Sequence, residues 1–165
     1  MADLEKITVT IKNFDLKASS DLDALYTRVR LEDAQGNTFY FKEVVVPKYL
    51  KNHGAMATEV ARTWYFKRLS KKAIVVLAFE AKNGKVEYDL EDIRLIARST
   101  VLKGIVFSIG SVPAALIAAT ATFGLGLIII PMGLWYGYRN IFKLPGMLSR
   151  KRILRDFAQH GIVVR

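Results

Sequence analysis

Residues 104–138 read GIVFSIGSVPAALIAATATFGLGLIIIPMGLWYGY, and these 35 residues include no Lys, Arg, Asp or Glu. Aliphatic residues, Phe and Gly dominate the stretch, and Lys103 and Arg139 stand directly on either side of it. About 20 apolar helical residues are enough to cross the ~30 Å hydrocarbon core of a bilayer. The stretch therefore predicts a helical element that is inserted in a membrane.

The length of this stretch predicts two crossings. A single helix of this size would extend about 52 Å at ~1.5 Å per residue, which is too long for one ordinary span. Small and polar residues gather at Thr120–Gly124, a composition typical of a turn. Basic residues flank both ends, and the positive-inside rule places both groups in the cytoplasm: Arg94, Arg98 and Lys103 before the stretch, and Arg139, Lys143, Arg150, Lys151 and Arg152 after it. We therefore expect a transmembrane helical hairpin over residues 99–142 of an inner-membrane protein, with both termini cytoplasmic.

Two other arrangements remain open for the same residues. A break at Gly110–Pro113, with Ser111 as helix cap, would leave one long helix from Ala114 to Tyr138 as a single span. The hairpin could also form the buried core of a soluble protein, although a chain of 165 residues has little else with which to cover it.

Small residues recur along the stretch in two stripes, which predict close helix packing in lipid. In one interpretation, both stripes serve the two helices of one hairpin. In the other, the stripe from Gly110 to Gly126 pairs within the chain and the Gly133/Gly137 stripe pairs between chains, which favours a homo-oligomer or a membrane protein partner. The predicted packing residues are Gly110, Ala114, Ala118, Thr122, Gly126, Gly133 and Gly137. The predicted anchors at the membrane interface are Lys103, Trp135, Tyr136, Tyr138 and Arg139.

Residues 1–98 are predicted to form a cytoplasmic antiparallel β-domain of about six strands. Alternating apolar residues or turn signals delimit the strands, and the size fits a small OB-like or SH3-like barrel or a sandwich. In the second strand, Leu25, Thr27, Val29 and Leu31 are expected to share one face. The predicted strands are 6–14, 25–32, 38–46, 58–69, 73–80 and 85–90.

A helix is expected to begin at Asp89 or Glu91 and to run unbroken into the apolar stretch. Residues 143–165 are predicted to be a basic amphipathic segment, with a short helix over 149–160 and an added edge strand at 162–164. The apolar side of that helix either lies on anionic lipid or packs on the β-domain. The basic residues expected at the lipid surface are Lys143, Arg150, Lys151, Arg152 and Arg155.

The charge distribution favours lipid over nucleic acid as a partner. Residues 1–100 hold 17 basic and 14 acidic side chains, whereas residues 101–165 hold 8 basic and 1 acidic. The excess charge therefore flanks the membrane stretch, as expected for contact with an anionic inner leaflet, and nucleic-acid binding is not favoured.

No catalytic motif, metal-ligand spacing or cofactor fingerprint occurs in the sequence. We therefore assign no catalytic residue, no metal site and no cofactor. We expect a non-enzymatic interaction, assembly or regulatory subunit of an inner-membrane complex. The alternatives are an oligomeric pore, a membrane-tethered enzyme and a nucleotide-sensing barrel. The best acid-base candidates for an enzyme would be His53, Asp89, Glu91 and Asp92, and the Arg28/Arg30 and Lys67/Arg68/Lys71/Lys72 groups are candidates for phosphate binding.

Overall fold

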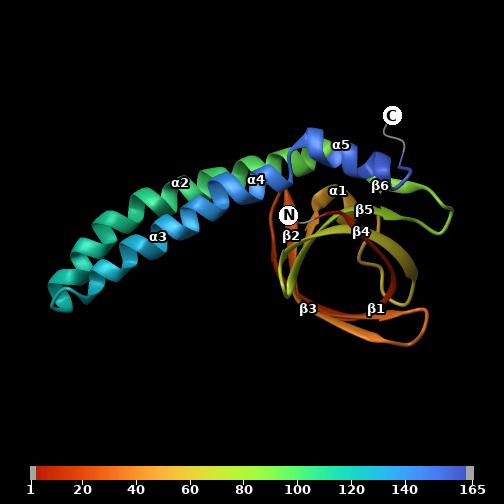
Figure 1. Ribbon diagram of the computed structural model, residues 1–165. Coiled ribbons are helices and arrows are strands. Elements are labelled where there is room, and N and C mark those ends of the chain that lie inside the picture. Colours follow the sequence, from red (N-terminus) through yellow and green to blue (C-terminus); the bar gives the residue numbers. More distant parts are fainter. Residues whose placement is uncertain (1–2, 163–165) are drawn as a thin grey trace. The chain divides into compact units, whose positions relative to one another are not determined.

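The computed structural model describes residues 3–162 and separates them into two compact units. Of the described residues, the first unit combines 3–96 with 150–162, and the second is formed by 97–149. The C-terminal segment therefore belongs to the same unit as the N-terminal β-domain, although the second unit lies between them in the sequence. Figure 1 labels the elements of both units.

The first unit is built on a six-stranded sheet with the spatial order β3-β2-β1-β4-β5-β6. The sheet closes on itself because β3 also pairs with β5, in parallel, through Glu43–Ala73, Val44–Ile74 and Val45–Val75. A short helix, α1 (Lys48–Asn52), connects β3 to β4. The six strands are β1 (Glu5–Ser19), β2 (Asp23–Asp33), β3 (Thr38–Pro47), β4 (Ala61–Ser70), β5 (Ala73–Glu80) and β6 (Val86–Tyr88).

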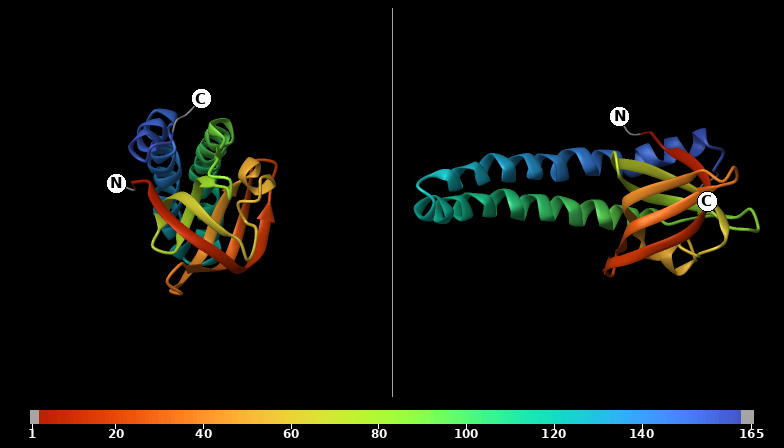
Figure 2. Two further views of the ribbon diagram at one scale, coloured as in Figure 1. Left: turned by 90° about the vertical axis from the view of Figure 1, so that its right-hand side faces the viewer. Right: turned by 90° about the horizontal axis from the view of Figure 1, so that it is seen from below.

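The closed ring of five strands, β1-β2-β3-β5-β4, confirms that the β-domain is a small barrel (Figure 2). Closure of the ring favours a barrel over the predicted alternative of a sandwich. One pairing differs from the prediction, because the β3–β5 pair is parallel in a sheet that was expected to be wholly antiparallel. A barrel of this kind supports many functions, so the fold alone assigns none.

The barrel interior is filled by alternate residues of the strands, whose side chains face inward. Trp64 and Phe66 of β4 are buried there, as their spacing of two residues predicts. The indole Nε1 of Trp64 donates a hydrogen bond to the carbonyl oxygen of Ala55 at 3.1 Å, which satisfies its polar atom in the core. Other members of the core include Val9, Ile11, Val29, Leu31, Val44, Val46, Ile74, Val76 and Phe79.

The prediction that Leu25, Thr27, Val29 and Leu31 share one face of β2 is wrong for its first half. Tyr26 is buried in the core, whereas Val29 and Leu31 are buried farther along the same strand. The inward side changes parity because the β1–β2 register shifts between Asn13 and Asp15, opposite Arg28, whose φ is 53°. An extra residue in a strand moves every following side chain to the other face.

The same irregularities explain why β1 is longer than predicted. The pairing of β1 with β2 shifts at three places between Ile11 and Ala18, so the apolar alternation is lost while the backbone pairing continues to Ser19. Residues 15–19, which lie beyond the predicted end of this strand at residue 14, are therefore part of it.

The outer face of β4 and β5 is covered by α5 (Arg150–Gln159) of the same unit. Phe157 of α5 contacts Tyr88 edge to face, with ring centroids 5.6 Å apart, and His160 contacts Tyr65 at 6.1 Å. Ile153 and Phe157 are fully buried. Of the two interpretations of this helix, the structure thus has its apolar side packed on the β-domain. Ile162 is buried but not in a strand, and the rest of the predicted edge strand, 163–164, lies outside the described residues.

The second unit is a pair of antiparallel helical arms that lie side by side (Figure 2). Its first arm is α2 (Leu90–Ala121), whose 32 residues begin in the first unit and continue without interruption through Pro113. This continuity confirms that the helix runs from the β-domain into the apolar stretch. The alternative break at Gly110–Pro113 is wrong, and the chain reverses instead at residues 122–124, within the predicted turn.

The returning arm is divided into four shorter elements. They are a 3₁₀ segment η1 (Leu125–Ile128), α3 (Ile129–Tyr138), a π-helical segment η2 (Arg139–Lys143) and α4 (Leu144–Met147). The junction residues Ile128, Arg139 and Leu144 keep right-handed helical dihedral angles, so the arm stays helical while its hydrogen-bonding pattern changes. Pro131 lies in the first turn of α3, where a missing backbone donor costs little.

Candidate functional site: an apolar helical hairpin

The two arms meet along a seam in which glycines of the returning arm face small residues of α2. A Cβ atom added to Gly137 would overlap the hydroxyl of Ser108, and one added to Gly133 would overlap Ser111. At the end nearest the turn, a Cβ at Gly126 would lie 2.7 Å from that of Ala118. Only glycine permits backbones to approach this closely, which is the packing expected of helices in lipid.

The structure divides the predicted packing residues between the seam and an open face. Ala118, Gly126, Gly133 and Gly137 lie in the seam, and Thr122 takes part in the turn. Gly110 has no atom within 4 Å of an added Cβ, and Ala114 is exposed. The α2 side of the seam runs instead through Gly104, Ser108, Ser111, Ala115 and Ala118. Sequence spacing missed this stripe because Ser108 and Ser111 interrupt its apolar character.

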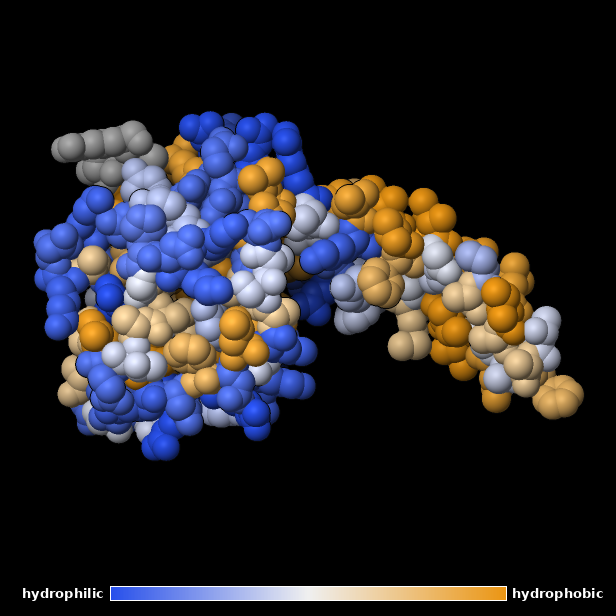
Figure 3. Space-filling model, turned by 180° about the vertical axis from the view of Figure 1, so that it is seen from behind, coloured by the Kyte–Doolittle hydropathy of each residue, from blue (hydrophilic) through white to orange (hydrophobic). Residues whose placement is uncertain are grey.

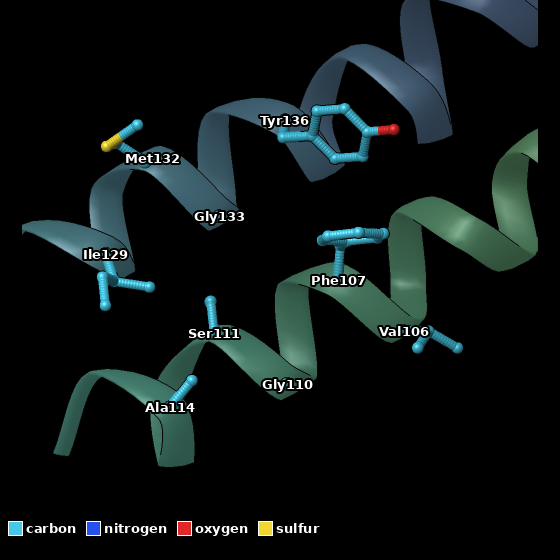
Figure 4. Close-up of a pocket in the computed structure, with 9 residues that line it drawn as sticks. All are labelled: Val106, Phe107, Gly110, Ser111, Ala114, Ile129, Met132, Gly133 and Tyr136. Carbon is cyan, nitrogen blue, oxygen red and sulfur yellow. The ribbon is translucent and has the colours of Figure 1, made fainter. Parts of the chain in front are cut away.

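The open face forms a shallow apolar groove of about 540 Å³ between the arms. Phe107 of α2 and Tyr136 of α3 point toward each other at one end of it (Figure 4), and their ring centroids are 5.0 Å apart. Gly110 and Ala114 line the α2 side, and Ile129 and Met132 line the α3 side. The groove therefore presents carbon surface and a run of small residues, with few polar atoms.

Most side chains on the outside of the hairpin are apolar and exposed (Figure 3). Ile117 is 72% exposed and Leu125 is 71% exposed. Within residues 3–162, α2 is the one helix that is long and apolar enough to cross a membrane, and only 17% of its most apolar window is buried. A helix in the core of a soluble protein would be mostly buried, whereas most of this window is exposed.

The predicted anchors gather at the end of the hairpin opposite the turn. A Cβ at Gly104 would lie 2.9 Å from that of Asn140, which places Lys103 and Arg139 at about the same level of the two arms. Trp135 and Tyr138 are exposed within one turn of Arg139, and Tyr136 faces Phe107. Aromatic and basic residues therefore share one end of an otherwise uncharged hairpin.

The other predicted basic residues occupy two places. Lys143 is exposed on the returning arm, whereas Arg150, Lys151 and Arg155 are exposed on α5 and Arg152 is half-buried there. The side of α5 that carries these charges stays open to solvent, because the apolar side is packed on the barrel.

The barrel contains a buried ion pair that the sequence did not indicate. Lys67, a member of one candidate phosphate-binding group, is 0% exposed, and its Nζ lies 2.6 Å from Oδ2 of Asp156, which is 9% exposed. Trp64 and Phe66 face the interior, so Lys67 faces outward and is buried only because α5 covers it. Asp156 is the single acidic residue of the last 65 positions. Its isolation is the one feature of the sequence that could have indicated a specific cationic partner.

A second polar cluster lies where β6 meets α1. Glu87 accepts a hydrogen bond from the hydroxyl of Tyr49 at 3.0 Å and pairs with Nζ of Lys85 at 2.8 Å. The Lys85 partner lowers the pKa of the Glu87 carboxyl, and the bond to Glu87 raises the pKa of the Tyr49 hydroxyl. A cavity of about 620 Å³ borders these side chains, with Gly161 and Ile162 on its rim. Both oxygens of Glu87 are thus engaged within the protein.

The acid-base candidates are used in the local structure of the domain. Oδ1 of Asp89 accepts hydrogen bonds from the backbone N–H groups of Glu91 and Asp92, which confirms that the acidic cluster marks the start of a helix. Oδ2 of Asp92 accepts from the backbone N–H of Tyr49 at 2.9 Å, and His53 stacks on the Tyr49 ring. Among the described residues, no three His, Cys, Asp or Glu side chains are grouped for a metal ion.

Members of both candidate phosphate-binding groups are also paired with acids. Arg68 forms two hydrogen bonds to Glu5, at 2.7 and 2.9 Å, and Arg28 pairs with Asp15. Together with the Lys67–Asp156 pair, these contacts leave each group with less positive charge than its sequence suggests. Comparisons with known protein families, curated proteins and solved structures found no match.

Proposed function

We propose that the protein is a non-enzymatic membrane module, in which the helical hairpin anchors the β-barrel domain at the cytoplasmic face of the inner membrane. The exposed apolar surface of the hairpin carries this proposal, because water disfavours such a surface and lipid does not. The anchored barrel would then recruit, assemble or regulate a membrane complex. Anionic lipid at the inner leaflet would contact the basic residues at the end of the hairpin.

The proposal includes two crossings, with both termini in the cytoplasm. Its support is the turn at residues 122–124 and the grouping of Lys103, Arg139 and the aromatic side chains at the opposite end. The returning arm is divided among four elements, so it would cross as a helix with local 3₁₀ and π geometry. Irregular hydrogen bonding is tolerated in a membrane where neighbouring helices cover the backbone.

The experiment that tests anchoring is extraction of native membranes at alkaline pH. We expect the full chain to remain in the membrane pellet and to be released only by detergent. A reporter domain that is active only outside the cytoplasm should be silent after Arg165. Inserted at Thr122 it should be active, because the two arms would carry a whole inserted domain past the far edge of the membrane. Release at alkaline pH would contradict the membrane anchor, and activity after Arg165 would contradict the two crossings.

We further propose that a second copy of the hairpin, as a homo-oligomer, packs against the groove that contains Gly110 and Ala114. The sequence predicted Gly133 and Gly137 for a contact between chains, but in the structure both residues lie in the internal seam. Gly110 and Ala114 are the small residues that the seam leaves open, and small residues allow helices to approach in lipid.

Cross-linking in native membranes tests this contact. Gly110→Leu with Ala114→Leu should reduce the dimer band several-fold. Ala121→Leu, which adds the same bulk as Ala114→Leu on an exposed part of α2 outside the groove, should leave it unchanged. If wild type gives only a monomer, the groove is filled by lipid or by a different protein. Purification with native neighbours, which should then retain a stoichiometric partner, separates these two occupants.

A further inference from the structure

We infer that the turn of the hairpin lies at the far edge of the hydrocarbon core. The two arms then cross the core, but the turn itself contacts lipid acyl chains and does not project into the far aqueous compartment. This inference rests on the proposed membrane anchor and adds the depth at which the anchor stops. The turn comprises residues 122–124 between α2 and η1.

The first support is the distance from the charged end of the hairpin to the turn. Gly104 to Ala121 is 18 helical residues, or about 27 Å at ~1.5 Å per residue. The hydrocarbon core is ~30 Å thick. Lys103 and Arg139 can therefore stay among the near headgroups only if the turn stops at or inside the far edge of the core. A turn that projected into water would draw both cations into hydrocarbon, which is costly.

The second support is that both hydroxyl groups at the turn, and several of its backbone N–H groups, have partners within the hairpin. The hydroxyl of Thr120 donates to the carbonyl oxygen of Ile117 at 2.7 Å, and that of Thr122 donates to Ala118 at 2.6 Å. The Thr122 hydroxyl also accepts from the backbone N–H of Gly126 at 2.9 Å. The N–H of Gly124 donates to the carbonyl oxygen of Ala119 at 2.9 Å. These groups do not need water as a partner, which lowers the cost of placing them in lipid.

The third support is Phe123, which occupies the apex of the turn. Its side chain is fully exposed, and its backbone adopts φ of 49°, a left-handed conformation that is unfavourable for a bulky residue. Gly124 follows with φ of 93°. In water, an exposed aromatic ring at a strained position would bring no gain. In lipid, the ring is solvated by acyl chains, which accounts for an aromatic residue where glycine or asparagine would fit the backbone better.

Spin labelling measures this depth directly, because the chain has no cysteine and any introduced one is unique. The full-length variants Phe123→Cys and Leu125→Cys report on the turn, since both side chains are exposed. Leu116→Cys reports on the middle of an arm, and Ser149→Cys reports on the end with basic residues. Each variant is labelled with a nitroxide and reconstituted in vesicles of phosphatidylethanolamine and phosphatidylglycerol.

We expect labels at 123 and 125 to be relaxed more strongly by oxygen, which concentrates in lipid, than by a water-soluble nickel chelate, as at 116. The label at 149 should show the opposite order. If labels at 123 and 125 resemble 149 while 116 resembles lipid, the anchor stands and the embedded turn is overturned. If 116 also resembles water and the protein does not float with the vesicles, the membrane anchor itself fails, and the inference fails with it.

Discussion

Lys67 and Asp156 form the most direct polar link between the barrel and the C-terminal helix. Removing one member of a buried ion pair leaves the other charge uncompensated, which typically costs about 3–5 kcal/mol. Replacing both members by apolar residues of similar volume is often neutral or stabilising. The pair therefore stabilises little beyond an apolar contact, but it fixes which residue of α5 lies over β4.

We predict that Lys67→Met and Asp156→Leu each lower the free energy of unfolding by several kcal/mol, and that the double variant recovers most of this loss. Unfolding in denaturant can be followed in detergent by the fluorescence of Trp64, in a Trp135→Phe background. As a matched control, Arg68→Met breaks the exposed pair with Glu5 and should cost less than about 1 kcal/mol. Equal losses in the single and double variants would show that the two side chains are not coupled.

At the scale of elements, the features predicted well are those that one short window of sequence contains. Local signals in apolar alternation, capping or small residues mark the strands β3, β4 and β5, the start of α2 after Asp89 and the turn after Ala121. The inward side of β2 was mispredicted at its start because the bulge at Arg28 shifts the pattern by one residue. No window contains the parallel β3–β5 pairing or the packing of α5, since both join residues that are distant in sequence.

The same limit applies to the candidate site. Sequence spacing identified the glycines of the returning arm, but their partners depend on how the two helices are rotated about their axes. Two stripes of α2 offer small residues, and the stripe through Ser108 and Ser111 faces the returning arm. The choice between them is decided by packing across the seam, which a single helix pattern cannot report.

We predict that cysteines at Ser108 and Gly137 form a disulfide within one chain. Their Cβ atoms would be 3.1 Å apart, a few tenths of an ångström below the usual disulfide range of about 3.5–4.5 Å, so a small shift suffices. Mild oxidation in membranes, followed by electrophoresis, should give a faster-migrating monomer that a reductant reverses. The matched pair of cysteines at Gly110 and Gly137 should not form it, because Gly110 faces away from the seam. Equal cross-linking of both pairs would contradict the described rotation of α2.

At the scale of the whole molecule, the first unit is discontinuous in sequence, because residues 150–162 complete a domain that begins before residue 97. The hairpin is therefore an insertion between two parts of one folded domain, and not an appendage at its end. The segments predicted from the sequence divide the chain into three consecutive parts, 1–98, 99–142 and 143–165. The compact units differ because the last segment packs on the first, a contact that is invisible in the local pattern of either one.

This discontinuity has a consequence for biosynthesis. Asp156 is made 60 residues after Ile96, which is about 3–12 s at the usual synthesis rate of ~5–20 residues per second. Through this interval the hairpin emerges from the ribosome while β4 and β5 still lack their cover, and Lys67 lacks the carboxylate of Asp156. The nascent barrel thus displays a transient surface during the time when the hairpin must reach the membrane. A ribosome-bound chain that ends at Ser149 should cross-link chaperones or targeting factors through a probe at Tyr65, and the completed chain should not.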